Sequence, residues 1–457
     1  MPRGCGLRAK VPSAAADAEA DAALAKWWAG RTCRADTVEV TATPRSVQAT
    51  YLALQLVTTL ATSLIWGVNT LFLLDAGLNN LEAFAANAFF TAGMMLFEIP
   101  TGVVADLRGR RLSFLLGAAT LCGSTLLYVL LWQQHASFPL WAAVSMLLGL
   151  GFTFFSGAVE AWLVDALAAT GFTGELDSVF GKGQAVQGGA MLVGSVAGGY
   201  LAQATSLGVP FVARAVLLVV AFAIAAAAMH DLGFSPDHVT GPGAQVRLIW
   251  HDSLRYGFGQ PPIRWLMLSS PFIGGVAVYA FYAMQPYLLQ LWGDPGAYGI
   301  AGLAAAIVAG AQVVGGLAAP RLRRLVGVRT TWLLVTTAAS TTALLLAGVL
   351  DSFWPVIALL VVWGFASSTA LPVRQAFVNG LIPSRQRATV LSFDSLMSST
   401  GGVALQPALG RAADLSGYPL TFVLGGIAQA CALPLIAMAR REGAPSDRVP
   451  SRAAPSP

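Results

Sequence analysis

The fold is decided by the stretch Phe97-Glu98-Ile99-Pro100-Thr101-Gly102-Val103-Val104-Ala105-Asp106-Leu107-Arg108-Gly109-Arg110-Arg111. An apolar run ends in this stretch with two glycines, an aspartate and three arginines, and a second apolar run begins at Leu112. Glycine permits close approach of backbones, and arginine is enriched where a membrane helix ends on the cytoplasmic side. The stretch therefore predicts a tight turn between two membrane helices on the positively charged side of a membrane.

The composition indicates an integral membrane protein. The 457 residues are 56% hydrophobic and only 11% charged, whereas a soluble globular protein carries roughly 25% charged residues. At about 20 residues per span, the length allows roughly a dozen helices. The net charge of +5 does not indicate a nucleic-acid partner, because in a membrane protein the distribution of Lys and Arg carries the information.

Apolar runs follow one another from Tyr51 with short polar breaks. The predicted fold is an all-α polytopic membrane protein with twelve transmembrane helices. We expect these helices at residues 51–75, 80–104, 112–132, 138–165, 181–205, 210–229, 263–291, 297–319, 330–350, 354–380, 389–410 and 418–439.

The one long connection between these helices divides them into two six-helix halves. The expected organisation is a cytoplasmic tail at 1–50, a first half at 51–229, a cytoplasmic loop at 230–262, a second half at 263–440 and a disordered tail at 441–457.

The positive charges predict which side of the membrane each connection faces. Of the 27 Lys and Arg residues, 24 fall in the tails and in the alternate connections that share their side. Only Arg411 falls in the opposite connections, and Arg214 and Arg374 lie inside helices. Both termini are therefore expected in the cytoplasm of a cell with a bacterial-type inner, or plasma, membrane.

The two halves show weak internal similarity. Gly316 follows Gly102 by 214 residues, and each precedes a basic cluster. The pair Gly401-Gly402 follows Gly188-Gly189 by 213 residues. Matches at nearly one offset favour two parallel repeats, related by an axis along the membrane normal.

The loop after the second predicted helix resembles the signature of the major facilitator superfamily of secondary transporters. The residues that carry the resemblance are Gly102, Asp106, Arg108, Gly109, Arg110 and Arg111. The resemblance implies alternating access to a central site near the membrane midplane, with an ion gradient as the energy source. It implies a transporter rather than an enzyme, with a small-molecule substrate, protons and the lipid bilayer as partners and no cofactor. We expect a monomer.

The charges of this loop suggest a gate. Asp106 can pair with Arg110 or cap a neighbouring helix, while the arginines meet anionic headgroups. The corresponding loop of the second half has Pro320 where the aspartate would stand. Only the gate of the first half is expected to be fully formed.

Charged side chains inside apolar helices are candidates for coupling or for ion pairs, because an ionised carboxylate in hydrocarbon costs at least a few kcal/mol. Glu98 and Asp165 lie near cytoplasmic helix ends, where each is expected to form a salt bridge with the arginine cluster. Asp394 can cap its helix or meet Arg387.

Glu160 and Arg374 are 214 residues apart and so occupy related places in the two halves. They can pair across the central cavity when it closes on one side, or Glu160 can titrate as the coupling proton site. A purely structural ion pair is the alternative.

Small residues in the fifth predicted helix indicate close helix packing and a pivot. Gly194, Gly198 and Gly199 resemble the Gly-Pro-x-x-Gly-Gly signature of antiporters in the superfamily, but Ser195 stands in place of the proline. The arginine that proton-linked drug exporters usually carry in helix four is also absent. The direction of transport therefore stays open.

The first and seventh predicted helices supply polar and aromatic candidates for the cavity wall. These candidates are Trp66, Asn69, Tyr279, Tyr282 and Gln285. An aromatic face with few charges suits bulky, weakly polar molecules, and helix packing or an interfacial aromatic belt is the alternative explanation.

The stretch from Ser156 to Asp165 and the approach to the loop from Phe97 look most like bacterial multidrug or hydrophobic-compound exporters. Proton-coupled efflux of a bulky, largely apolar compound is the predicted function. The alternatives are an uptake symporter or facilitator for a polar solute such as a sugar or amino acid, and a membrane receptor or scaffold that moves no solute. The chain lacks the P-loop pattern GxxxxGK[ST], so ATP is not expected as the direct energy source.

Overall fold

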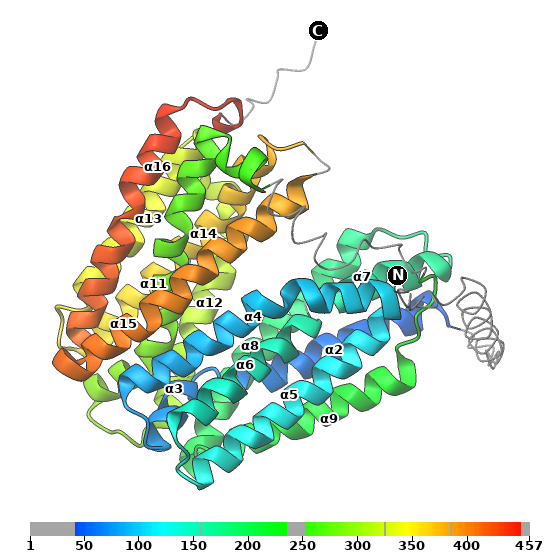
Figure 1. The fold of residues 1–457 in the computed structure, drawn as a ribbon, viewed down its shortest axis with the longest axis horizontal. Helices are drawn as coiled ribbons and strands as arrows, with labels where there is room; N and C mark the ends of the chain where they lie inside the picture. Colours follow the sequence, from blue (N-terminus) through cyan, green and yellow to red (C-terminus); the bar gives the residue numbers. More distant parts are fainter. Residues whose placement is uncertain (1–41, 156, 235–252, 324–325, 384–385, 449–457) are drawn as a thin grey trace, which may run out of the picture. The chain divides into compact units, whose positions relative to one another are not determined.

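The computed structural model describes residues 42–155, 157–234, 253–323, 326–383 and 386–448. Every named element in these ranges is helical, and Figure 1 labels most of them. The N-terminal helix group consists of α2 (Pro44–Ser63), α3 (Asn69–Asp75), α4 (Asn80–Arg108), α5 (Arg110–Gln133), α6 (Phe138–Phe155), α7 (Ala158–Ala169), α8 (Leu176–Ala204) and α9 (Val209–Ala228).

The rest of the described chain forms the C-terminal helix group. Its elements are the π-helix η1 (Ser253–Phe258), α11 (Pro261–Trp292), α12 (Tyr298–Leu322), α13 (Arg329–Ala347), α14 (Phe353–Asn379), α15 (Arg387–Ala430), α16 (Ala432–Arg441) and the short helix η4 (Pro445–Asp447).

Ten helices in the described ranges are long and apolar enough to cross a membrane, counted by length and composition. Two features explain why this number is smaller than the twelve expected spans. The helix α2 carries many threonines and glutamines and is not among the ten. Residues Thr389–Arg441 count as one span of 53 residues, although the backbone breaks inside it at Gly417, where φ is 77° and ψ is 172°.

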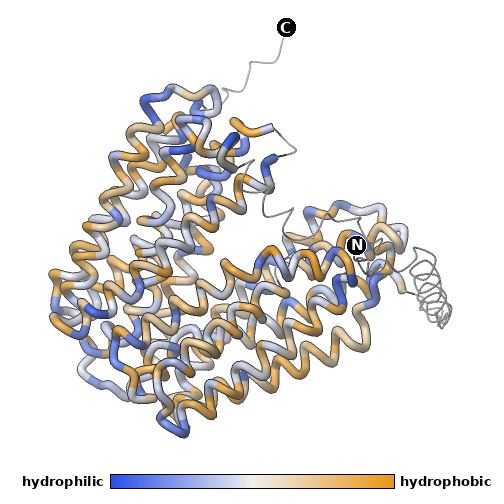
Figure 2. The backbone as a smooth tube through the Cα atoms, viewed as in Figure 1, coloured by the Kyte–Doolittle hydropathy of each residue, from blue (hydrophilic) through white to orange (hydrophobic). Residues whose placement is uncertain are grey.

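The surface of the helices suits a lipid environment. Leu96, Val193 and Leu415 are each at least 60% exposed. Exposure of these apolar side chains is unfavourable in water and favourable in hydrocarbon. Figure 2 shows hydrophobic residues along the lengths of the helices and many hydrophilic residues near their ends.

Local sequence signals explain several helix ends. Asn79 caps α4, since its side chain accepts a hydrogen bond from the Glu82 backbone N–H at 2.9 Å, and the Glu82 carboxylate accepts the Asn79 N–H at 3.1 Å. The helices α4 and α5 meet at Gly109, whose φ of 102° suits glycine and few other residues. The turn predicted from the opening stretch is therefore present.

Each helix group packs mainly within itself, and the two groups meet chiefly through α4 with α15 and α8 with α12. We call the end of the helices that carries residues 64–79 and 293–297 the closed end, because direct hydrogen bonds join the groups there. We call the end that carries Gly109 the arginine end.

The expected boundaries need two adjustments. The helix α2 begins at Pro44, inside the expected tail 1–50. Residues 442–448 of the expected disordered tail are packed, because Asp447 accepts hydrogen bonds from the Thr330 N–H at 2.8 Å and the Thr330 hydroxyl at 2.7 Å. Most of the tail 1–50, the middle of the loop 230–262 and residues 449–457 lie outside the described residues.

Candidate functional site

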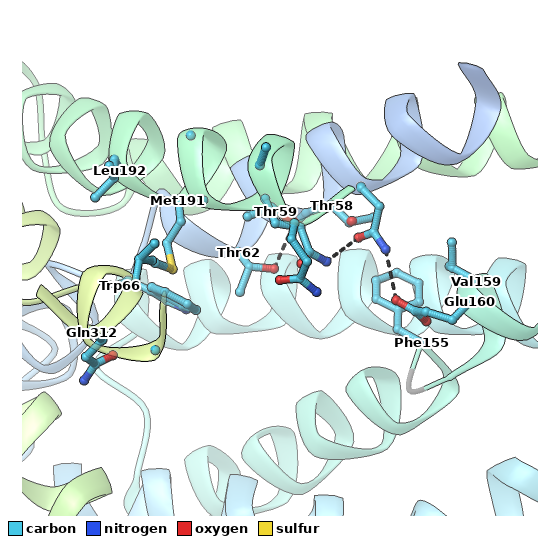
Figure 3. A pocket seen from close by; sticks show the side chains of 18 of the residues that line it. Thr58, Thr59, Thr62, Trp66, Phe155, Val159, Glu160, Met191, Leu192 and Gln312 are labelled. Carbon is cyan, nitrogen blue, oxygen red and sulfur yellow. Dashed lines mark hydrogen bonds between the residues drawn. The ribbon is translucent and has the colours of Figure 1, made fainter. Parts of the chain in front are cut away.

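A cavity of about 1190 Å³ lies among α2, α7, α8 and neighbouring helices, with one wall supplied by α12 (Figure 3). Its apolar lining includes Trp66, Phe152, Phe155 and Met191. Its polar lining comes largely from glutamines and threonines. A volume of this size accommodates a drug-sized molecule.

A chain of hydrogen bonds runs along the polar side of this cavity and is drawn as dashed lines in Figure 3. The Gln187 amide donates to the Gln55 carbonyl oxygen at 2.6 Å. The Gln55 amide in turn donates to the Glu160 carboxylate at 3.0 Å. Among the described residues that line the cavity, Glu160 supplies the one carboxylate.

The backbone places Glu160 at the cavity wall. Between α6 and α7 the chain turns at Gly157, which has a left-handed φ of 68°, and Glu160 falls in the first turn of α7. The dipole at a helix N-terminus favours a negative charge at this position. The hydrogen-bond donor to Glu160 is a neutral amide, and its carboxylate forms no ion pair with a described residue.

A second pocket of about 480 Å³ lies in the C-terminal helix group and shares Gln312 with the first. Eight of its lining residues are Ser or Thr. Arg374 and Asp394 also line it and form an ion pair at 2.7 Å, with their side chains 13% and 15% exposed. The guanidinium of Arg374 donates further hydrogen bonds to the Leu266 carbonyl at 2.7 Å and to the Ser269 hydroxyl at 3.2 Å.

This pairing corrects the expectation for Asp394 and shows which partner Arg374 has in this structure. Arg374 pairs with Asp394 on the adjacent helix rather than with Glu160, which lies in the other helix group. Asp394 meets Arg374 rather than Arg387, whose guanidinium donates to the Asn379 carbonyl at 3.1 Å. The 214-residue offset gives corresponding positions in the two groups, but it does not bring the two side chains together.

The arginine loop contains the pair that its spacing suggested. Asp106 and Arg110 form an ion pair at 2.6 Å across the bend at Gly109. The side chain of Arg111 donates to the Ala226 carbonyl at 2.5 Å, at the end of α9. Among the described residues, none of these contacts reaches the C-terminal helix group.

Asp231 is a member of this loop cluster that the sequence analysis missed. Its carboxylate accepts the Arg111 backbone N–H at 2.9 Å and lies where a side chain at Gly109 would have to be. Burial raises the pKa of Asp231, and the neighbouring arginines lower it in part. The sequence gives only a faint signal for this contact. The N-cap residue of α5 is a glycine, which has no side chain to accept hydrogen bonds from the free N–H groups of the first turn. A residue from elsewhere in the chain must therefore accept them.

The remaining charged candidates make no ion pair with a described residue. Glu98 is exposed on α4, and Asp165 is partly buried on α7. Their expected salt bridges with the arginine cluster are not formed in this structure. Arg108 is exposed, and the space around Gly102 is open.

The predicted cavity residues divide between the cavity and the packed interior. Trp66 lines the large cavity. Asn69 is buried and donates to Asn87 at 3.0 Å. Tyr279 is 1% exposed and donates its hydroxyl hydrogen to Thr421 at 2.6 Å, so it belongs to the core.

The other two candidates on α11 lie where the helix groups meet. Gln285 bridges them, since its amide donates to the Trp66 carbonyl at 2.6 Å and its oxygen accepts the Thr70 N–H at 2.9 Å. Tyr282 is partly buried and lies within electrostatic range of Arg214 in the N-terminal group.

The three glycines of α8 lie at close helix contacts. A side chain at Gly194 would collide with Ser63, and one at Gly198 would collide with the Leu64 carbonyl. A Cβ atom at Gly199 would lie 2.6 Å from the carbonyl oxygen of Tyr298 in the other helix group. These positions therefore hold α8 against α2 and against α12.

The closed end is held by contacts that the sequence did not reveal. The Asp414 carboxylate on α15 accepts the backbone N–H groups of Asn80 and Leu81 at 2.9 Å each. On α8, the Gln203 side chain accepts the Gly299 N–H at 2.9 Å. In both places a side chain of one helix group satisfies the free N–H groups at the start of a helix in the other.

The polar lining of the cavity had a detectable signal that the sequence analysis did not use. Gln55, Thr58, Thr59 and Thr62 follow one another on α2 at spacings of one and three, and all line the cavity. Such a polar stripe inside an otherwise apolar helix marks one face. In the described residues, no group of three or more His, Cys, Asp and Glu side chains is placed to hold a metal ion.

Comparisons with known proteins agree with this architecture. A family model described as Major Facilitator Superfamily matches residues 51–325 and 272–457. Among curated proteins, none matches the chain significantly.

Solved structures of low sequence identity share the fold. The nucleoside transporter NupG aligns with a TM-score of 0.73 and 11% identity, over 86% of this chain and 98% of NupG. The POT family transporter PepTSo aligns with a TM-score of 0.66 and 13% identity, over 88% of this chain and 98% of PepTSo. A POT family transporter in complex with 5-aminolevulinic acid aligns with a TM-score of 0.65 and 13% identity, over 86% of this chain and 96% of that transporter. At these identities the likeness concerns the fold alone.

Proposed function

The chain belongs to the major facilitator superfamily of membrane transporters, and we propose that it is a secondary active transporter that works by alternating access. In this proposal α2 with α3 form the first span, α6 with α7 form the fourth, and the break at Gly417 separates the last two. The result is twelve spans in two six-helix halves that rock about the central cavity.

One observation carries the proposal: the large cavity is walled by both helix groups, while direct hydrogen bonds between the groups gather at the closed end. In the described residues, the charged loop at the arginine end makes no hydrogen bond or ion pair with the other group. With the arginine end in the cytoplasm, as the Lys and Arg distribution favours, this is an inward-facing state. Asp106 and its arginines then engage when the halves close on that side.

Protons are the proposed coupling ion, and Glu160 is the proposed coupling site. Its carboxylate lines the cavity and has a neutral hydrogen-bond partner. Asp394 is a poorer candidate, because the guanidinium of Arg374 holds it in an ion pair. A proton on Asp394 would leave a buried arginine without its counter-charge, which is costly.

Efflux of a bulky, largely apolar compound is the proposed direction and substrate class. The aromatic and methionine side chains of the large cavity offer apolar contact to such a compound. We place the protein in a bacterial-type inner membrane, as a monomer with both termini in the cytoplasm.

Uptake of a polar solute is the second candidate. The second pocket favours it, because eight of its lining residues are Ser or Thr and can hydrogen-bond a hydroxylated or amide-bearing solute. The similar structures named for nucleoside and peptide transport are also compatible with it.

Everted membrane vesicles with a preformed proton gradient separate the candidates. Discharge of the gradient on addition of bulky apolar compounds supports exchange and efflux. Discharge by sugars, nucleosides or amino acids, when these are added to the opposite face in right-side-out vesicles, supports uptake. No response to any of these compounds would contradict the transport function.

A further inference from the structure

Arg214 is a buried cation, and the transport mechanism proposed above gives it no role. It lies in α9, one of the candidate membrane spans, and is only 3% exposed. Its Nε atom has no hydrogen-bond partner, and the guanidinium forms no ion pair with a described residue. A cation in this environment normally faces a counter-charge or a functional path.

In the described part of the chain, the groups found near Arg214 are neutral. Its guanidinium carbon lies 5.6 Å from the centre of the Phe152 ring. The hydroxyls of Tyr128 and Tyr282 are within electrostatic range, and that of Tyr128 is already hydrogen-bonded to Ser145 at 2.6 Å. Aromatic faces and hydroxyls stabilise a guanidinium in part, but they leave its net charge uncompensated.

Two of these neighbours connect Arg214 to the proposed transport path. Phe152 also lines the large cavity, so this residue adjoins both the cavity and the guanidinium of Arg214. Tyr282 belongs to α11 of the other helix group, so its position relative to Arg214 changes when the groups rock. Tyr282 can therefore move away from Arg214 during a transport cycle, whereas Phe152 lies on α6 of the same helix group as Arg214.

We propose that Arg214 is an anion-binding group of the transport path, which receives a carboxylate, sulfonate or phosphate group of the transported molecule. The substrate would then be an amphiphile with an apolar body and an anionic substituent. This inference rests on the proposed transport function and narrows its substrate class. An arginine suits the role because its planar donors match such oxyanions in a bidentate way.

Thermal unfolding of the purified full chain in detergent tests this inference without a gradient. The probes are sodium 1-naphthoate and 1-naphthamide, which share a ring system and differ in charge. We expect naphthoate to stabilise the wild type and to bind the Arg214→Met variant about tenfold more weakly, the scale of one charge-assisted hydrogen-bonded contact. Naphthamide should affect both proteins equally, and Arg214→Lys should keep part of the naphthoate effect.

Three possible outcomes of this experiment would overturn the inference. Without probe, Arg214→Met should unfold at the wild-type temperature or above it, because an uncompensated charge is removed. A lower unfolding temperature would make Arg214 a structural residue. Equal naphthoate affinity in both proteins would show that Arg214 does not bind the anionic group of the substrate. Stabilisation of the wild type by phosphatidylglycerol micelles alone would exclude the same role. None of these results bears on whether vesicles discharge a proton gradient, so a failure here is distinct from a failure of the transport function.

Discussion

The carboxylate of Asp414 caps the first turn of α4 by accepting the backbone N–H of Asn80 at 2.9 Å, although the two residues belong to different helix groups. The adjacent Leu81 N–H donates to the other carboxylate oxygen at the same distance. An acidic cap at a helix N-terminus is stabilised both by these hydrogen bonds and by the helix dipole. The contact therefore favours the state in which this end is closed.

Asp414→Ala should loosen the closed end. Loss of a cap of about 1–2 kcal/mol shifts a two-state equilibrium by roughly tenfold. The measurement is the rate at which a membrane-impermeant thiol reagent, added outside cells, labels Thr70→Cys in a background without other cysteines. Thr70 is fully buried and its hydroxyl has no partner, so the cysteine leaves no broken side-chain bond. Asp351→Ala, which alters an exposed acidic residue near the same end, is the control. Equal labelling in the two variants would show that Asp414 does not hold the end closed.

Glu160→Gln should abolish proton-driven accumulation and spare downhill exchange. The amide oxygen can still accept the hydrogen bond that Gln55 donates at 3.0 Å, but it cannot take up a proton at physiological pH. Transport assays in vesicles with and without a gradient measure the two activities. Glu175→Gln, at the exposed start of α8 outside both pockets, should behave as the wild type. Proton-driven accumulation that survives in Glu160→Gln would exclude this residue as the coupling site.

The ion pair between Asp394 and Arg374 should contribute strongly to the thermal stability of the folded protein. Asp394→Ala leaves a largely buried guanidinium without its counter-charge, which costs about 3–5 kcal/mol when a buried pair is broken. The thermal unfolding temperature in detergent should fall accordingly. The double variant with Arg374→Ala should be less destabilised than the two single effects combined. Additive single effects would mean that the two side chains contribute independently.

Gly198→Val should prevent α8 from packing on α2, because a side chain at this position collides with the Leu64 carbonyl. Overpacking of this kind typically costs 1–3 kcal/mol, and more where the backbone cannot move, as estimated from core substitutions. The yield of monodisperse protein in size-exclusion chromatography reports the effect. Gly123→Val is the matched control, since the space around Gly123 is open. Similar yields from both variants would show that the close approach of α8 is dispensable.

Asp106→Asn should slow transport while leaving membrane insertion unchanged. The pair with Arg110 has side chains that are 35% and 22% exposed, and an ion pair of this exposure contributes at most about 1 kcal/mol to folding. A large effect on the transport rate would therefore come from the gate, not from loss of the fold. The rate in vesicles, normalised to the amount of inserted protein, is the measurement. An unchanged rate would exclude the gate role.

The sequence predicted the helix pattern well, because each apolar run and each glycine-marked turn is a local signal. The bend at Gly109 and the pair Asp106–Arg110 follow from residues close together in the chain. The positions of Tyr279 and Gln285 did not follow. In a membrane protein, residues that face lipid, core and cavity are all largely apolar, so helical periodicity identifies a shared face without stating what that face meets.

Contacts between distant segments were the least predictable part. Asp231 caps the start of α5 across 120 residues, and Asp414 caps α4 across 334 residues. Both satisfy free backbone N–H groups, which every helix start presents. The sequence reveals that such partners are needed, but many acidic residues could supply them. Only the packing of the helix groups selects one.

The central claim is that the two helix groups rock about the cavity, and distances between spin labels at both ends test it most directly. One label pair replaces exposed residues toward the arginine end, Leu107 and Ser392, and the other replaces exposed residues near the closed end, Gln134 and Asp351. We predict that a compound which discharges the proton gradient shortens the first distance and lengthens the second. Distances that stay fixed, or that change in the same direction while the compound is bound, would contradict alternating access.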